Sequence, residues 1–390
     1  MLAVRYDLAR VAAAVTKEAL RSRPPGMYRF RELTPLVDGE APVTLGEGGT
    51  PLLPLPRLAA YLGVRDLLAK DEGQNPTGTF KARGLGMAIT RARTLGGRGL
   101  IVPSAGNAGG AAAVYAARAG LPCAVIVPRD TPSAAVVEAM IAGAHVFTVE
   151  GSIGTAGAIV SRAGPRLGWL DLSTLKEPYR LEGKKTMGLE LAEQLGWSMP
   201  DIVMYPTGGG TGLVGIAKAY EELLAMKWLS GRLPRFVSVQ AEGCAPIVRA
   251  WATGAATPTP WDHPVTHAAG LRVPSPFAGR QMLQLIRDTG GEAIAVSEAA
   301  IADAQRHLAR LEGVWSAPEA AATVAALVTM KDAGRLPPDV RVVLVLTGAG
   351  IKNDPPALPA VTDLSGGAPA DTEAMVDAVV ASLVRSVPAR

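Results

Sequence analysis

The chain has 390 residues, enough for two domains with a large core, which excludes a small peptide scaffold. Hydrophobic residues make up 48% of it and charged residues 19%, and glycine occurs 44 times, which favours a compact α/β enzyme over a disordered or fibrous protein. The net charge is only +4, from 39 basic and 35 acidic residues without a basic run, so nothing indicates nucleic-acid binding.

Cysteine and histidine usage predicts neither a disulfide framework nor a metal site. Cys123 and Cys244 lie far apart in the sequence. His263 and His267 are four residues apart, but they lie in a proline-containing loop pattern with only Asp262 as a neighbouring carboxylate. The sequence shows no signal-peptide pattern and no apolar run of membrane-spanning length. We therefore expect a cytoplasmic protein without a metal and without a membrane partner.

Residues 1–50 are predicted to form an N-terminal arm. An amphipathic helix is expected over residues 8–20, and a proline and glycine break follows at 23–26. Residues 43–54 alternate strand-like pieces with glycine and proline, which predicts an irregular extended segment laid over a domain.

Residues 66–95 contain the first candidate for a reactive group. Their pattern predicts a strand over 66–70, a turn over 75–78 and a helix over 80–95, which places Lys81 in the first helical turn. A helix N-terminus and burial both disfavour a cation, so both would lower the pKa of this lysine, and a neutral amine can form a Schiff base. On these residues alone, a solvated surface lysine after a capped turn is the more common arrangement.

From residue 98 the sequence changes to regular strand, loop and helix units. The expected strands cover 100–102, 121–127 and 145–149, and the expected helices cover 111–118, 131–142 and 152–167. Successive units of this kind predict a parallel sheet with right-handed crossovers. Residues 98–165 are therefore expected to form a small inserted α/β domain.

Residues 51–97 and 166–355 are predicted to form a large domain that would bind the cofactor. Its further expected strands cover 201–205, 235–240 and 341–347, and its expected helices cover 183–195, 213–225, 301–311 and 317–333. A tail over 356–390 carries one expected helix, over 372–385, whose apolar stripe predicts docking on the core.

Four loops share one pattern, in which a hydrophobic strand is followed by glycine, serine, threonine or asparagine. These loops are 75–81, 104–110, 208–212 and 347–350. In an open parallel sheet, such loops gather beyond the carboxyl ends of the strands, where ligands bind. The sequence therefore predicts one site built from all four loops.

The loop over residues 208–212 indicates the ligand. Its glycines leave backbone amides unhindered at a helix N-terminus, the arrangement that holds a phosphate group. It does not match the nucleotide-triphosphate loop, and Leu213 in the last position does not fit the dinucleotide fingerprint. Taken alone, a glycine loop of this kind is as often a plain tight turn as a phosphate site. Together with Lys81 as a candidate Schiff-base lysine, it suggests a monophosphorylated aldehyde cofactor, pyridoxal phosphate.

These motifs together resemble the threonine synthase group of the fold type II, or tryptophan synthase β-like, pyridoxal-phosphate enzymes. The resemblance spans about residues 43–352, and supporting segments lie at 45–51, 179–186, 270–274 and 312–319. It implies an α/β fold of two open, mostly parallel sheets flanked by helices, with the cofactor in the cleft between them. Related enzymes are commonly homodimers.

The resemblance also implies how the cofactor would be held. Lys81 would bind it as a Schiff base and later move the Cα proton of the substrate. Asn107 would hydrogen-bond the 3′-oxygen, and Thr347 would face the pyridine nitrogen. The residues that would wrap the phosphate are Gly208, Gly209, Gly210, Thr211 and Gly212.

For the substrate, a small amino acid, the resemblance points to a second set of residues. Ser104, Ala105 and Gly106 would approach its carboxylate, and the Ser104 hydroxyl serves either there or as a helix cap. Lys185 is a candidate for binding the distal part of the substrate. Other basic residues that could join it there, or be solvated or paired charges, are Arg180, Lys184 and Arg272.

Two departures leave the reaction open between alternatives. The threonine synthase group commonly has an aspartate after the Schiff-base lysine and a threonine after the loop asparagine, where this chain has Ala82 and Ala108. The leading hypothesis is conversion of O-phosphohomoserine and water to threonine and phosphate. The alternatives are β-elimination of the serine or threonine dehydratase kind, β-replacement, or a catalytically silent binding protein that kept the fold.

Overall fold

The structure, a computed structural model, describes residues 2–358, 373, 375–377 and 379–380. The chain divides into two compact units, Met1–Asp354 and Pro355–Arg390, and the fold described below is that of the first. Most of the tail helix predicted over 372–385 lies outside the described residues, so its docking on the core stays a prediction.

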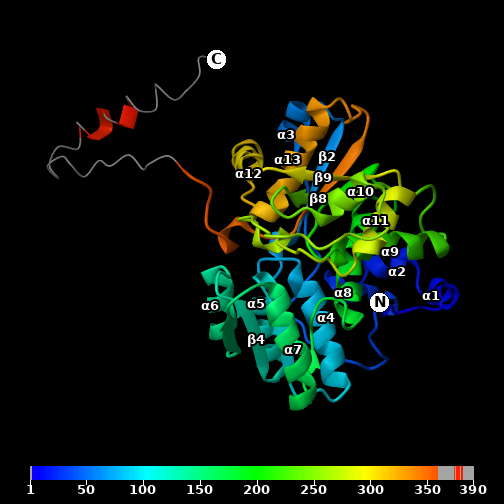
Figure 1. The fold of residues 1–390 in the computed structure, drawn as a ribbon. Helices are drawn as coiled ribbons and strands as arrows, with labels where there is room; N and C mark the ends of the chain where they lie inside the picture. Colours follow the sequence, from blue (N-terminus) through cyan, green and yellow to red (C-terminus); the bar gives the residue numbers. More distant parts are fainter. Residues whose placement is uncertain (1, 359–372, 374, 378, 381–390) are drawn as a thin grey trace. The chain divides into compact units, whose positions relative to one another are not determined.

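Two sheets organise the first unit (Figure 1). The larger has six strands in the order β1 (Leu52–Pro54), β2 (Asp66–Asp71), β10 (Arg341–Leu346), β7 (Ile202–Pro206), β8 (Arg235–Ala241) and β9 (Glu292–Val296), all parallel except β1. The smaller is parallel throughout, with the order β5 (His145–Val149), β4 (Cys123–Pro128), β3 (Leu100–Pro103) and β6 (Leu170–Asp171). The predicted fold class is confirmed, whereas the division into a large and a small domain stays a prediction.

The larger sheet is buried on both faces because alternate side chains of each strand enter different cores. On β10, Val343 and Val345 pack with helices α8 (Tyr179–Gln194), α9 (Thr211–Ala225) and α11 (Gly279–Asp288). Their neighbours Val342 and Leu344 pack on the opposite face with α3 (Pro56–Leu62), α12 (Glu298–Glu312) and α13 (Pro318–Asp332). The continuous apolar strands seen in the sequence follow from this two-sided burial.

The smaller sheet has the same construction. Leu100 and Val102 face α4 (Lys81–Thr94), α5 (Asn107–Ala119) and α6 (Ser133–Ile141), whereas Ile101 faces α7 (Ile153–Leu167). Figure 1 shows these four helices together around β4. Helix α4 also packs against α8, so it joins the two sheets.

The N-terminal arm differs from its prediction. Residues 8–20 form two short helices, α1 (Leu8–Ala14) and α2 (Lys17–Arg21), rather than one. Val15 is extended, and the Thr16 side chain accepts a hydrogen bond from the Ala19 N–H, so a new helix begins there. The 3₁₀ helix η1 (Met27–Leu33) follows the predicted break.

Helix α8 begins at Tyr179, four residues before its predicted start. The Glu177 carboxylate accepts hydrogen bonds from the backbone N–H groups of Tyr179 and Arg180, which satisfies the first turn. The prediction also missed several elements, namely α3, α10 (Pro246–Ala252), α11, β6 and β9. Helices α3 and α10 start with a proline in the first turn, a position that tolerates it.

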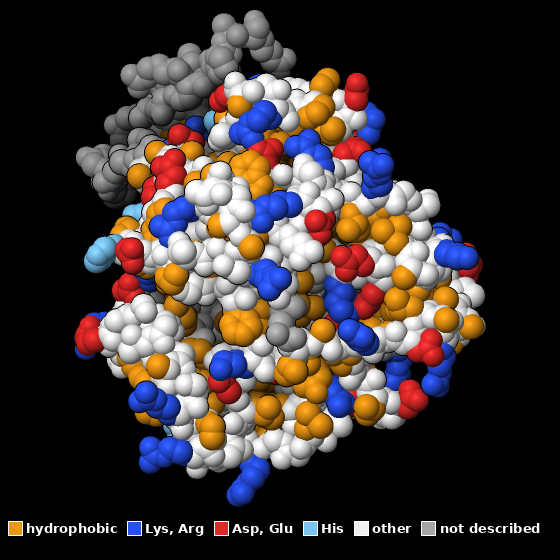
Figure 2. All heavy atoms as spheres, turned by 45° about the vertical axis from the view of Figure 1, so that its right-hand side comes forward, with side chains coloured by type: hydrophobic (Ala, Val, Ile, Leu, Met, Phe, Trp, Pro, Cys, Tyr) orange, Lys and Arg blue, Asp and Glu red, His pale blue; other side chains and the backbone are white. Residues whose placement is uncertain are grey.

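Neither the charge distribution on the surface nor the length of the described helices is unusual. Figure 2 shows basic and acidic side chains intermixed over the visible face, as the small net charge leads us to expect. Among the residues described, no helix has the length and apolarity needed to cross a membrane.

A buried ion cluster ties α4 to both β2 and α8. Arg83 on α4 is fully buried and donates to Glu72 at 2.6 Å and to Glu190 at 2.7 Å. Lys70 on β2 donates to the same Glu190 carboxylate at 2.7 Å. Two cations and two anions therefore compensate one another in the interior, where an unpaired charge would be very costly.

Replacing Glu190 by glutamine should destabilise the fold by about 3–5 kcal/mol at pH 7, because two buried cations lose a partner. Burial alone would raise the pKa of Glu190, but Arg83 and Lys70 hold it well below its usual 4.5. The stabilisation is therefore present above about pH 4.5 and is lost as the pH falls further. Urea unfolding of the wild type and of Glu190→Gln at several pH values measures both effects.

The matched control is Glu150→Gln, which removes the acidic partner of Arg129 in an exposed ion pair. Its unfolding free energy should stay within about 0.5 kcal/mol of the wild type. A similarly small change in Glu190→Gln would contradict the importance assigned to the buried cluster.

Candidate active site

The four predicted loops meet around one cavity of about 630 Å³. Each loop follows the carboxyl end of a strand, β2, β3, β7 or β10, so both sheets direct their loop ends to the same place. The predicted residues that line the cavity are Lys81, Ser104, Ala105, Gly106, Asn107, Gly208, Gly209, Gly210, Thr211, Gly212 and Thr347.

Lys81 is the first residue of α4, and backbone contacts fix its position. The Phe80 N–H donates to the Thr347 carbonyl at 3.0 Å, and the Ala349 N–H donates to the Gly78 carbonyl at 2.9 Å. The loop before Lys81 is thereby bound to the loop after β10. The Lys81 amine lies 4.2 Å from the centre of the Phe80 ring.

The surroundings of Lys81 favour its neutral form. Burial lowers its pKa to about 7, and the nearby Arg180 acts in the same direction, whereas Glu319 opposes them. Near neutral pH a substantial fraction of the side chain is therefore an uncharged amine, the form that reacts with a carbonyl.

The glycine loop is a tight cradle. A Cβ atom at Gly208 would overlap the Gly270 carbonyl oxygen, and one at Gly212 would overlap the Tyr205 hydroxyl. Gly210 has φ +79°, a conformation that favours glycine. Helix α9 begins at Thr211, so the N–H groups of its first turn have no partner within the helix. Unhindered amides at a helix N-terminus fit a phosphate group.

The Ser104 hydroxyl is used by the backbone. It accepts hydrogen bonds from the Gly109 N–H at 2.8 Å and the Gly106 N–H at 3.2 Å, and it donates to the Gly106 carbonyl at 2.7 Å. Of the two uses expected for this side chain, the structure shows the one that stabilises the start of α5. Asn107 is the first residue of that helix and faces the cavity.

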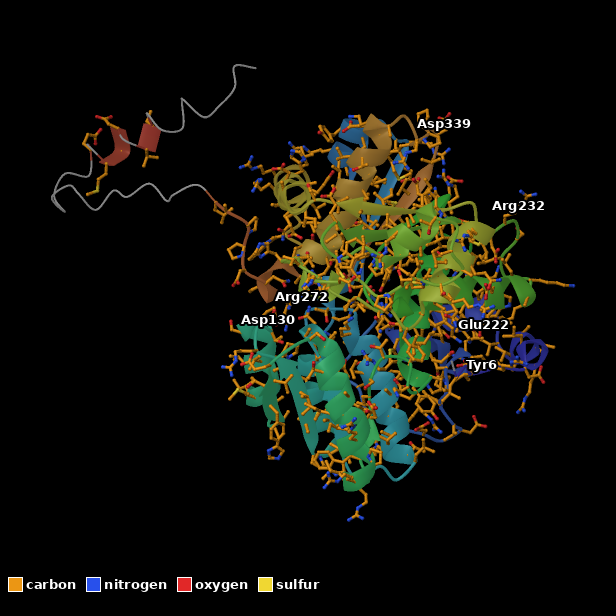
Figure 3. The ribbon with its side chains drawn as sticks, in the orientation of Figure 1. Tyr6, Asp130, Glu222, Arg232, Arg272 and Asp339 are labelled. Atoms are coloured by element: carbon orange, nitrogen blue, oxygen red, sulfur yellow. The ribbon has the colours of Figure 1, made fainter. Side chains whose placement is uncertain are left out.

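Lys185 does not line the cavity, and its expected place there requires correction. Its amine lies 2.8 Å from the Glu182 carboxylate and 2.7 Å from that of Glu222, and 3.9 Å from the centre of the Tyr6 ring. Figure 3 shows Tyr6 of the arm beside Glu222 of α9. Lys185 thus fastens the arm to α8 and α9.

Arg180 and Lys184 line the cavity instead. They are four residues apart on α8 and therefore share one helix face, whereas Glu182 and Lys185 lie on another. The helix predicted from the sequence began at residue 183 and left out Arg180, so the sequence did not place Arg180 and Lys184 on one helix face. Recognising Glu177 as the cap of a helix that begins at Tyr179 would have placed Arg180 and Lys184 on the same face.

Sequence reasoning missed two further buried groups in the cavity wall, Tyr205 and Glu319. The Tyr205 hydroxyl and one Glu319 oxygen find no hydrogen-bond partner among the described residues. Burial raises the pKa of both groups, while the Gly270 N–H, 2.7 Å from the other Glu319 oxygen, acts against the increase for Glu319. Unpartnered polar atoms in the wall are consistent with a cavity built for a polar ligand.

Two ion pairs span the rim of the cavity. Arg272 binds Asp130 at 2.8 Å, and Lys352 binds Glu138 at 2.7 Å. Figure 3 shows Arg272 and Asp130 facing each other from loops of the two halves of the unit. Charged groups associated with the larger sheet are thus joined to groups associated with the smaller one.

We expect the amine of Lys81 in cofactor-free protein to react with pyridoxal phosphate at a rate that rises with pH around a midpoint near 7. Arg180→Gln should move the midpoint to higher pH, because the arginine lowers the lysine pKa, and Glu319→Gln should move it to lower pH. Stopped-flow absorbance between pH 5.5 and 9 measures the rate. Lys81→Ala is the blank, and a midpoint that ignores both substitutions would contradict the assignment.

Comparison with known proteins agrees with this geometry. Residues 43–348 match the family described as pyridoxal-phosphate dependent enzyme. A threonine synthase of Methanosarcina acetivorans is 37% identical over 354 residues, which cover 90% of this chain and 86% of that protein. A threonine synthase of Methanocaldococcus jannaschii is 36% identical over 359 residues, 92% of this chain and 88% of that protein.

Among solved structures, maize serine racemase aligns with a TM-score of 0.67 at 22% identity, covering 85% of this chain and 93% of that one, which shows a shared fold. The expected cofactor and the fold type II architecture are thereby confirmed. The glycine cradle, the low-pKa lysine and the unpartnered Tyr205 hydroxyl also fit a phosphorylated aldehyde. The chain belongs to the family of pyridoxal-phosphate dependent enzymes, within which threonine synthases are its relatives.

Proposed function

We propose that this protein is a lyase that converts O-phosphohomoserine and water to threonine and phosphate. The observation that carries the proposal is Arg180, which lines the cavity although it is only 3% exposed. It donates to the Leu172 carbonyl, and none of the described carboxylates lies within ion-pair distance of it. A buried cation without a counter-ion favours a substrate that brings an anion of its own, such as a phosphate ester.

The related proteins give independent support. The two proteins of 36–37% identity described above, from Methanosarcina acetivorans and Methanocaldococcus jannaschii, carry the name threonine synthase, and each matches most of this chain. The cavity also contains Lys81, Lys184 and Arg272, with Glu319 as an opposing charge. Most of the ionisable groups in the cavity wall are basic, and an anion beside them favours their protonated forms, so the cavity suits a substrate with both a carboxylate and a phosphate.

The residues that would hold the cofactor are Lys81, Asn107, Thr347 and the glycine loop Gly208, Gly209, Gly210, Thr211 and Gly212. When bound, the cofactor supplies an electron sink for the charge that develops at the substrate Cα. Thr347, at the end of β10, offers a neutral hydroxyl to the ring, which does not enforce a proton there. Asn107 offers an amide side chain at the start of α5.

The remaining steps belong to residues of the protein. Lys81, as a neutral amine, accepts the Cα proton and can return it, since its pKa of about 7 favours transfer in both directions. The backbone of Ala105 and Gly106 and the first turn of α5 bind the substrate carboxylate. Arg180 binds the phosphate ester and stabilises the phosphate as it leaves.

The second candidate is β-elimination or β-replacement on another amino acid. Ala108 lines the cavity and presents only a methyl group where the threonine synthase group commonly has a hydroxyl. That observation favours a reaction that needs no hydroxyl near the distal end of the substrate.

A substrate panel separates the two candidates. The holoenzyme should release phosphate and form threonine in equal amounts from O-phosphohomoserine, and it should show little turnover of serine, threonine or O-phosphoserine. Arg180→Gln should raise KM at least about tenfold, the cost of one charge-assisted hydrogen bond. Lys176→Gln, which removes a more exposed lysine of the same cavity, is the matched control and should change KM little.

Ammonia and a keto acid released from serine or threonine, without threonine formation from O-phosphohomoserine, would favour elimination. Cofactor binding without turnover of any of these amino acids would favour a silent binding protein. Lys81→Ala should abolish every one of these activities.

We further propose that the protein is a cytoplasmic homodimer. The dimer rests on the resemblance to enzymes that are commonly dimers, and the compartment is supported by two buried, unpaired thiols at Cys123 and Cys244. Light scattering of the purified holoenzyme should give twice the chain mass. A monomer mass at micromolar concentration would contradict the dimer.

A further inference from the structure

Lys184 is a buried lysine placed between the starts of two helices. It is 1% exposed and lines the cavity, and its amine donates to the Thr211 hydroxyl at the first position of α9. Its stem crosses the first turn of α4 at Gly84, where a Cβ atom would lie 3.1 Å from the lysine Cε. The absence of a side chain at Gly84 therefore admits the lysine to this position.

The electrostatic surroundings of this amine are unfavourable to a cation. The N-termini of α4 and α9 both carry positive partial charge. Burial, and then the charges of Lys81 and Arg180, lower the pKa of Lys184 well below its usual value, with Glu177 as the opposing group. An anion is the missing partner that would make a protonated Lys184 favourable here.

The other buried lysines show how unusual this arrangement is. Lys70 and Lys185 are equally buried, and each has a carboxylate at 2.7 Å. For Lys184, no carboxylate in the described part of the chain lies within ion-pair distance. The hydroxyl of Thr211, its hydrogen-bond partner, belongs to the loop already assigned to a phosphate.

We propose that Lys184 is a ligand of the cofactor phosphate, which it contacts as an ammonium group beside Thr211. The amides of the glycine loop supply partial charges, whereas Lys184 supplies a full charge against the dianion. Binding of the phosphate raises the pKa of the lysine, so the lysine takes up a proton as the anion enters. Arg180 stays available for the substrate, and the loaded site has a compensated charge beside Lys81.

Binding to cofactor-free, full-length protein tests the proposal without reference to activity. Lys184→Gln should weaken pyridoxal phosphate binding about 10- to 100-fold, the range expected for a charge-assisted hydrogen bond, and leave the binding of pyridoxal, which lacks the phosphate, unchanged. Lys184→Arg should restore part of the affinity. Lys176 lines the same cavity, and Lys176→Gln should leave the affinities for pyridoxal phosphate and for pyridoxal unchanged.

Thermal stability gives a second test, because the substitution should have different effects on the unfolding temperature without and with phosphate. Cofactor-free Lys184→Gln should unfold at the same or a higher temperature than the cofactor-free wild type, because an uncompensated buried amine is gone. Inorganic phosphate should raise the unfolding temperature of the wild type more than that of the variant. A lysine that serves only packing would lower the first temperature and leave the phosphate effect intact.

Proton uptake completes the test on the wild type itself. Calorimetry of inorganic phosphate binding at pH 8, in buffers of different ionisation enthalpy, should show uptake of a proton that Lys184→Gln lacks. No uptake by the wild type would overturn the proposal even if the variant did not fold. Unchanged pyridoxal phosphate affinity in Lys184→Gln, with a raised KM for O-phosphohomoserine, would also overturn it and assign the lysine to the substrate.

Discussion

The buried guanidinium of Arg83 is the contact on which the arrangement of this active site depends. Every one of its N–H donors has a partner, from the arm, α8 or the segment just after β2. Arg83 lies two residues after Lys81, and its acceptor Glu190 lies on the helix that carries Arg180 and Lys184. The same network therefore sets the distance between the reactive amine and the cations around it. A buried cluster of this kind adds little net stability over apolar packing, whereas removing one of its partners is costly.

Helix α8 separates two tasks between neighbouring lysines. Lys184 turns toward the cavity and Lys185 toward the ion cluster with Tyr6. A rotation of about 100° per residue is enough to place adjacent side chains in different environments. Close approach of α8 to α4 reinforces the separation, since a Cβ atom at Gly183 would overlap the Arg83 carbonyl. The position of each lysine is thus a consequence of where the helix begins and what it packs against.

The fold and most of the cavity could be predicted from the sequence. Strands that are buried on both faces appear in the sequence as continuous apolar runs. The glycine loop and Lys81 follow the carboxyl ends of such runs, so the residues of the site could be located from the strand pattern. Lys185 could not be placed, because the helix start depends on the Glu177 side chain rather than on a serine or threonine cap. The pairing of Lys70 and Arg83 with Glu190 could not be predicted either, since no local pattern reveals a partner more than a hundred residues away.

The ion pairs at the rim have a consequence for the passage of molecules through it. The Asp130 side chain is 62% exposed, so an anion that entered the cavity would compete with it for Arg272. Dissolved salt screens such charges over about 10 Å at 0.1 M, whereas it barely affects the ions sealed around Arg83. Added salt would consequently weaken the Arg272–Asp130 pair far more than the buried ion pairs of Arg83, which position the reactive lysine.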